Sequence, residues 1–176
     1  TEPEGLARVP SAIFSLGTLA VTALLARRFL DGRATSPGPS SPRAAFLAAA
    51  VLGTTVQFWD AGHRAVVDTS LTFFTTLGFA TLLGSFASPG TDGTDPSASR
   101  GLCFGLWTGL AFLSKGVVGP GFLALTALAL AATRREILRA RLWKFVGSAL
   151  ASFIIVAGPY VALLWARSPA YVEELF

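Results

Sequence analysis

The chain has 176 residues, of which 52% are hydrophobic and 14% charged, and it carries a formal net charge of +4. A soluble domain has about 25% charged residues, so this composition excludes an ordinary water-soluble globule and predicts an all-α integral membrane protein. Nucleic-acid binding is excluded as well, because Lys and Arg in a membrane protein mark cytoplasmic loops. The single cysteine, Cys103, excludes an internal disulfide, and no Cys/His cluster predicts a closed zinc site.

Apolar segments recur along the whole chain and predict one polytopic transmembrane helix bundle of about six spans. A spanning helix needs about 20 apolar residues, with a usual range of about 17–25, so the second and fourth segments are short. Gly158-Pro159 predicts a kink in the last segment. In chain order the predicted spans are Val9–Ala26, Ala44–Trp59, Thr69–Ala87, Gly101–Ser114, Val117–Thr133 and Phe145–Ala166.

The fourth and fifth segments form a hairpin in this interpretation, because Gly101–Thr133 is far too long for one span. Lys115-Gly116, followed by Gly119-Pro120-Gly121, supplies the break. Within the first arm, Gly105 and Gly109 are spaced as in the GxxxG pattern that lets two helices pack closely.

The connections between the segments alternate in charge, which predicts the orientation in the membrane. Two connections are rich in basic residues, and the positive-inside rule places both in the cytoplasm. The N-terminus is then outside, and because Thr1–Gly5 does not resemble a signal peptide, we expect the chain to be part of a longer protein with a helix upstream. The basic residues of the two rich connections are Arg27, Arg28, Arg33 and Arg43, and then Arg134, Arg135, Arg139, Arg141 and Lys144.

This orientation brings the isolated ionisable residues to the extracytoplasmic ends of helices. Asp68 opens the third segment, where it also suits an N-cap. Arg64 lies four residues earlier, and it either forms a weak local salt bridge or binds an anion. His63 is a single histidine beside aromatic residues, which is more typical of an interfacial polar side chain than of a ligand, although an acid–base role stays open.

Lys115 lies alone within the longest apolar stretch, in Gly109-Leu-Ala-Phe-Leu-Ser-Lys-Gly116. It could extend from the tip of a hairpin to the interface without any further role. Gly116 and Gly119, however, leave room for a bulky group, and an ammonium near a helix N-terminus is suited to phosphate. Ionisable residues inside a membrane are functional-site hypotheses by default.

Several segments together resemble a known family. Leu6–Ala12, Arg64–Phe74, Gly105–Gly116 and Ser168–Phe176 are similar, in this order, to segments of the polyprenyl-phosphate-sugar-dependent glycosyltransferases with a GT-C fold. The closest resemblance is to the aminoarabinose transferase-like and protein mannosyltransferase-like members. Each motif has low specificity alone, and the ordered set is more specific.

The resemblance implies transfer of a sugar from a polyprenyl-phosphate carrier to an acceptor outside the cytoplasm, by a multi-pass enzyme of the plasma or inner membrane. It implies that Lys115 contacts the lipid phosphate with Ser114 beside it, and that Asp68 and Arg64 line the same cavity. The principal catalytic carboxylate and a soluble C-terminal part would lie outside this sequence, and the fragment alone would be inactive. No cofactor is certain from the sequence, and a divalent metal stays open.

Two other interpretations compete with a transferase. A transporter or flippase core predicts charges at mid-membrane depth and symmetry between two halves, and the sequence shows no internal repeat. A noncatalytic membrane assembly subunit would use Lys115 and Asp68 only at helix ends. An acidic pair following an upstream first helix would favour the transferase.

Overall fold

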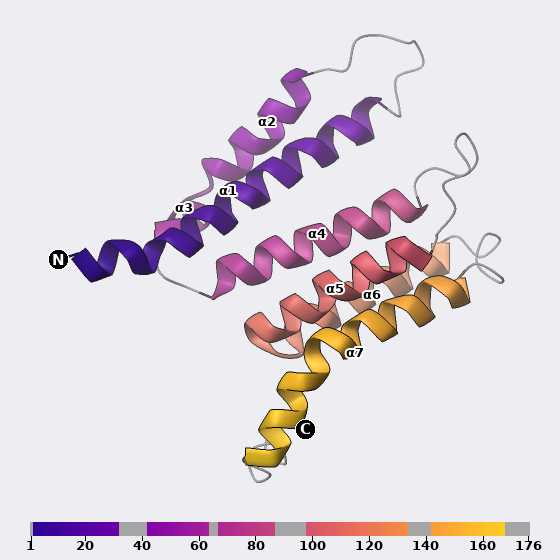
Figure 1. Ribbon diagram of the computed structural model, residues 1–176. Helices are drawn as coiled ribbons and strands as arrows, with labels where there is room; N and C mark the ends of the chain where they lie inside the picture. Colours follow the sequence, from indigo (N-terminus) through magenta and orange to yellow (C-terminus); the bar gives the residue numbers. More distant parts are fainter. Residues whose placement is uncertain (1, 32–41, 64–66, 87–97, 134–141, 168–176) are drawn as a thin grey trace. The chain divides into compact units, whose positions relative to one another are not determined.

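The computed structural model describes residues 2–31, 42–63, 67–86, 98–133 and 142–167, which form helices joined by short turns and contain no strand (Figure 1). The all-α prediction is therefore confirmed for the described residues. The chain divides into two compact units, Thr1–Thr76 and Leu77–Phe176. The helices are α1 (Glu2–Asp31), α2 (Pro42–Gly53), α3 (Val56–His63), α4 (Asp68–Phe86), α5 (Ala98–Lys115), α6 (Val118–Thr133) and α7 (Leu142–Arg167).

Two helices are long and apolar enough to cross a membrane, over Arg8–Arg28 in α1 and Trp143–Arg167 in α7, and they coincide with the first and last predicted spans. The pair α2 and α3 adds a third if it is counted as one bent span. These helices support association with a membrane. The six predicted spans are not confirmed, because α6 is apolar but only 16 residues long and α4 and α5 carry more polar residues.

In the first unit, α1 turns its hydroxyl-bearing side chains inward and its aliphatic side chains outward. Ser11, Ser15 and Thr18 recur at helical spacing and are buried, whereas Ile13 is 61% and Leu16 66% exposed. A helix of a water-soluble protein would have the opposite arrangement. The exposed aliphatic face therefore indicates an apolar solvent, in agreement with the composition.

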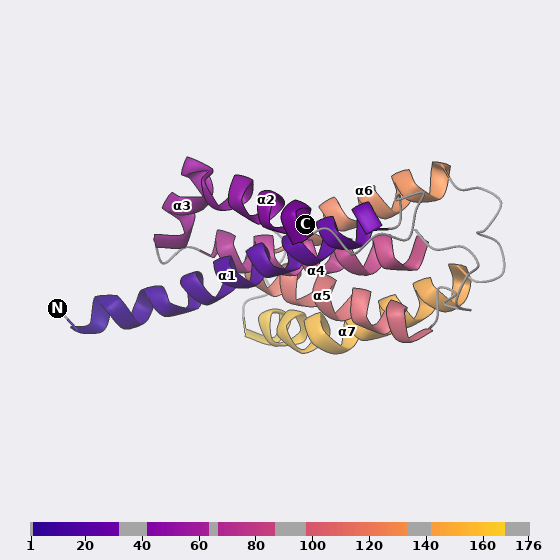
Figure 2. The same ribbon diagram turned by 90° about the horizontal axis from the view of Figure 1, so that it is seen from above.

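A sharp bend separates α2 from α3, which meet at 73°, so the predicted single helix Ala44–Trp59 is interrupted in the structure (Figure 2). The break lies at Thr54-Thr55. The Thr54 hydroxyl donates to Ala50 O at 2.8 Å, and the Thr55 hydroxyl donates to Val51 O at 3.0 Å. Ala50 O also accepts the backbone N–H of Thr54 at 2.9 Å, which is the last regular bond of α2. Val51 O accepts the hydroxyls of both threonines, and these bonds supply partners for a carbonyl at the end of the helix.

Aromatic rings pack α1 against the first half of α4 within this unit. Phe14 lies 5.6 Å from Phe73 and 5.5 Å from Phe74, measured between ring centroids, and the rings are tilted or edge-on, as aromatic pairs prefer. Gly17 lies opposite Phe73, and a Cβ there would come within 2.5 Å of the ring. The small residue at position 17 therefore lets the ring reach α1.

The second unit is built on close packing between α5 and α7. Gly101, Gly105 and Gly109 recur at every fourth residue of α5, and all three are buried. A Cβ at Gly105 would overlap the backbone carbonyl of Ala149 in α7, and one at Gly109 would lie 2.9 Å from Val156. The packing predicted from the Gly105–Gly109 pattern is thus confirmed, and Gly101 extends it by one turn.

The remaining helices of this unit pack through single well-buried side chains. Leu123 of α6 is fully buried, and a Cβ on Gly78 of α4 would come within 2.7 Å of it. The guanidinium of Arg100 donates to the carbonyl of Gly84, which caps the last turn of α4.

The α7 helix changes direction in its second half, where Pro159 removes a backbone donor, so the predicted kink is present (Figure 1).

The close approach of α5 and α7 makes a stability prediction. Gly105→Ala should destabilise the folded chain by about 1–3 kcal/mol, because the added methyl group meets backbone that cannot rotate away. The measurement is unfolding in mixed micelles followed by circular dichroism. Gly147→Ala is the matched control, since nothing lies within 4 Å of its Cβ position, and it should be neutral or stabilising. Equal effects of the two substitutions would contradict the packing argument.

Candidate functional site

Lys115 is the last residue of α5, and α6 begins at Val118, so Gly116 and Val117 alone form the turn. Gly116 has a φ of 65°, a left-handed conformation that glycine adopts without the cost borne by other residues. Its N–H donates to Phe112 O at 2.7 Å and closes the end of α5. The predicted hairpin is therefore confirmed, and the exposed side chain of Lys115 lies at its tip.

The turn leads directly into the N-terminal end of α6. The first amides of a helix have no partner within it, and Pro120 occupies one of these positions, where its missing N–H costs nothing. The N–H of Gly121 donates to Val117 O, in the turn, at 2.9 Å. An ammonium and the positive end of a helix dipole thus lie within a few residues of each other, which suits an anion.

Ser114 lies beside Lys115, but its hydroxyl proton is already used. The hydroxyl donates to Leu110 O at 2.9 Å, one turn earlier in α5. In this arrangement Ser114 can accept a hydrogen bond but does not offer its proton to a phosphate. Of the two adjacent residues predicted for this role, Lys115 is therefore the one with the suitable chemistry.

Asp68 is the first residue of α4, as predicted, and is partly exposed in the first turn. A carboxylate in this position complements the helix dipole. Its backbone carbonyl accepts the hydroxyl of Thr72 at 2.7 Å. The helix-start interpretation of Asp68 therefore agrees with the structure, and it is compatible with a further role.

The other predicted site residues are less well defined. His63 ends α3, and nothing of its side chain is described, while Arg64 lies outside the described residues. Asp68 belongs to the first unit and Lys115 to the second. A shared cavity for Lys115, Arg64 and Asp68 therefore stays a prediction.

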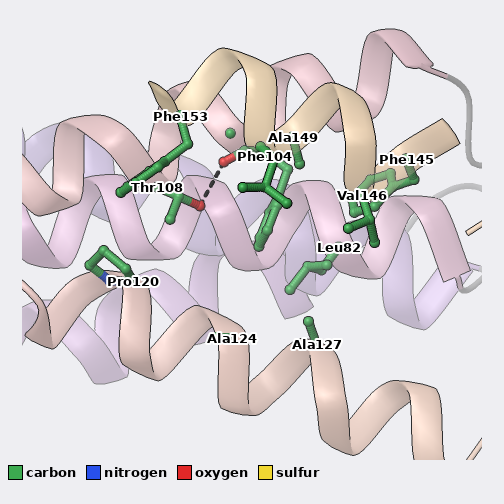
Figure 3. A pocket seen from close by; sticks show the side chains of 12 residues that line it. Leu82, Phe104, Thr108, Pro120, Ala124, Ala127, Phe145, Val146, Ala149 and Phe153 are labelled. Carbon is green, nitrogen blue, oxygen red and sulfur yellow. Dashed lines mark hydrogen bonds between the residues drawn. The ribbon is translucent and has the colours of Figure 1, made fainter. Parts of the chain in front are cut away.

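An apolar cavity of about 290 Å³ lies within the second unit, among the last half of α4 and helices α5 to α7 (Figure 3). Its walls include Leu82, Phe104, Pro120 and Phe153. Thr108 contributes a hydroxyl, which donates to Phe104 O at 2.7 Å and is satisfied there. The lining therefore suits hydrocarbon and offers no group for acid–base chemistry.

A second cavity, of about 460 Å³, lies between α1 and α3 in the first unit. Its walls combine apolar side chains with Arg8, Ser15 and Trp59. Sequence reasoning missed this site and included Arg8 only within the segment Leu6–Ala12. The helical spacing of Ser11, Ser15 and Thr18 predicts a buried hydroxyl-bearing face on α1, but not which helix lies opposite it.

No group of three or more His, Cys, Asp or Glu residues within the described ranges could hold a metal ion. Comparison with known protein families, with curated proteins and with solved structures finds no match to this chain. The relationship to glycosyltransferases therefore stays a prediction.

The geometry of the turn predicts the effect of Gly116→Ala. Alanine at a φ of 65° should cost about 1–2 kcal/mol, although nothing lies within 4 Å of its Cβ position. Gly121→Ala is the control, because its Cβ position is equally open and its backbone is not left-handed. Unfolding in mixed micelles measures both, and a Gly116→Ala variant as stable as the control would refute a left-handed turn.

Proposed function

We propose that this chain forms part of an integral membrane glycosyltransferase of the GT-C type, which binds a polyprenyl-phosphate-linked sugar and transfers the sugar to an extracytoplasmic acceptor. The observation that carries the proposal is the position of Lys115, an exposed residue at the end of α5, which a two-residue turn separates from the N-terminal end of α6. An apolar cavity in the same unit gives a hydrocarbon chain a place to lie.

The chemistry of the transfer fits this arrangement. The lipid phosphate is the leaving group, and a cation beside it stabilises the negative charge that develops as the glycosidic bond breaks. A lysine ammonium suits this role because it is a compact charge on a flexible stem. A carboxylate would take the proton of the acceptor, and we assign that role to no carboxylate of this chain. Asp68 and Arg64 are proposed to line the donor site.

The proposal also includes six membrane crossings, and one of these requires α4 to lie in lipid. Its composition is polar for a membrane span, but most of its hydroxyl groups donate to carbonyls of the helix itself. Thr75 donates to Leu71 O at 2.8 Å, and Thr81 donates to Leu77 O at 2.9 Å. Thr76 and Ser85 make the same bond one turn back, each at 2.7 Å. Placing α4 in lipid therefore costs less than its residue types indicate.

Lys115 has a second effect that must be separated from ligand binding. A cation in the last turn of a helix stabilises that helix by about 0.3–1 kcal/mol through the dipole. A noncatalytic assembly subunit could use Lys115 in this way alone. Stability therefore cannot distinguish the proposals, and the test must measure contact with the lipid phosphate.

Lys115→Ala should abolish photocrosslinking of the full-length membrane protein to a diazirine-bearing polyprenyl phosphate and lower sugar transfer by about 100-fold or more. Lys115→Arg keeps the charge and should keep most of the crosslinking. Lys144→Ala, which removes an exposed cation at the start of α7, is the control and should behave as wild type. Normal crosslinking and transfer by Lys115→Ala would overturn the proposal.

The proposed orientation is tested by replacing Arg64 with cysteine. Cys103 is exposed and must first be replaced by serine, because it would react as well. An impermeant thiol reagent should then label Arg64→Cys in intact cells, since position 64 is proposed to face the outside. A cysteine replacing Arg28, in the last turn of α1 and at the end proposed to face the cytoplasm, should be labelled only after permeabilisation. The reverse pattern would exclude this topology.

A further inference from the structure

The cavity between α1 and α3 has the composition of a site for an amphiphile. Its volume of about 460 Å³ lies within the range of about 300–1,000 Å³ that is typical of small-molecule sites. Val9, Leu16 and Phe58 give it apolar walls, and Arg8 supplies a cation. A cation and hydrocarbon walls in one cavity select a molecule that is anionic at one end and apolar along its body.

The position of Arg8 indicates where the anionic end would lie. Arg8 is exposed and is the first residue of the stretch Arg8–Arg28 that is long and apolar enough to cross a membrane. A residue at this boundary lies at the level of the lipid headgroups. Trp59 lines the same cavity and is 63% exposed, and tryptophan is favoured at that level as well. A guanidinium there matches the geometry of a phosphate.

Ser15 supplies a second, independent observation. Its side chain is 9% exposed, and its hydroxyl has no hydrogen-bond partner among the described residues. A buried hydroxyl without a partner costs about 1–3 kcal/mol. Ser15 lines the cavity two helical turns from Arg8, and a rotation about its Cα–Cβ bond can turn the hydroxyl toward an acceptor there. An ester oxygen of a lipid is such an acceptor.

We infer that the cavity between α1 and α3 binds an anionic glycerophospholipid of the bilayer, with its phosphate on Arg8 and an ester oxygen on the hydroxyl of Ser15. The bilayer itself presents this lipid at high local concentration, so a site of modest affinity is filled by mass action. Basic pockets between membrane helices are known to take anionic headgroups. This inference does not depend on glycosyltransferase activity.

The experiment uses quenching of Trp59 fluorescence by brominated lipids. The chain is reconstituted with Trp107, Trp143 and Trp165 replaced by phenylalanine, in phosphatidylcholine vesicles that contain a small fraction of brominated phosphatidylglycerol or brominated phosphatidylcholine. We expect Trp59 to prefer phosphatidylglycerol by about fivefold, the effect of one basic residue near a membrane surface. Arg8→Gln should remove this preference. A variant that keeps Trp143 as its single tryptophan is the control and should not respond to Arg8→Gln.

Ser15→Ala distinguishes the contact of the ester oxygen with Ser15 from the contact of the phosphate with Arg8. It should weaken the association of both lipids with Trp59 by about fivefold, because ester oxygens are common to both. In lipid-free micelles the same substitution should leave the chain as stable as wild type or more stable, since it removes a buried hydroxyl without a partner. Circular dichroism verifies that every variant keeps its helix content.

Four results would overturn the inference. The first is equal quenching of Trp59 by the two lipids, and the second is a preference for phosphatidylglycerol that survives Arg8→Gln. The third is quenching that Ser15→Ala leaves unchanged. The fourth is displacement of brominated phosphatidylglycerol by either of two other anions, inorganic phosphate or polyprenyl phosphate. Millimolar inorganic phosphate as an effective competitor would indicate a site for a free anion. Stronger displacement by trace polyprenyl phosphate than by phosphatidylglycerol would indicate a donor site instead.

Discussion

The contact between the backbones of α5 and α7 is the constraint on which the second unit depends. Lipid tails are as apolar as leucine side chains, so helices in a membrane gain little from hiding apolar surface and must associate by close packing. Gly101, Gly105 and Gly109 make this packing possible, because any Cβ at these positions meets atoms of α7. The packing of α5 against α7 fixes the direction of α5, and Lys115 is the last residue of α5. The position of the candidate phosphate contact thus follows from three residues without side chains.

The parts of the fold that could be predicted have local signals. Gly116 and Pro120 predict a turn followed by a new helix, and the spacing of the glycines in α5 predicts a face for close helix packing. The bend between α2 and α3 has no such signal, because Thr54 and Thr55 appear as mild interruptions of an apolar run. Threonine hydroxyls bond to the carbonyl one turn back both inside helices and at this break, so the residue types do not distinguish the two cases.

The same distinction separates the two candidate sites. Lys115 and Asp68 could be predicted because each is a single charge next to an apolar run, and each indeed lies at a helix end. The cavity between α1 and α3 could not, because Arg8 and Ser15 are separated from Trp59 by more than forty residues that form α1, a connection and α2. Arg8 therefore appeared in the sequence only as one basic residue among many. Its significance depends on what α3 places opposite it.

Many hydroxyl groups in these helices bond to the carbonyl one turn back, which makes the different behaviour of Ser15 informative. Thr18, Thr108 and Ser114 each donate to the carbonyl one turn back, as Thr75 and Thr81 of α4 do. Such a bond is available to any serine or threonine inside a helix, so a hydroxyl needs no external partner in an apolar solvent. Ser15 has the same option and does not use it. Its hydroxyl lies close to Gly62, where an added Cβ would come within 3.1 Å of the oxygen, and both residues line a cavity that also contains a cation. The unpaired hydroxyl and the cavity therefore have the same explanation, a ligand oxygen that none of the described residues supplies.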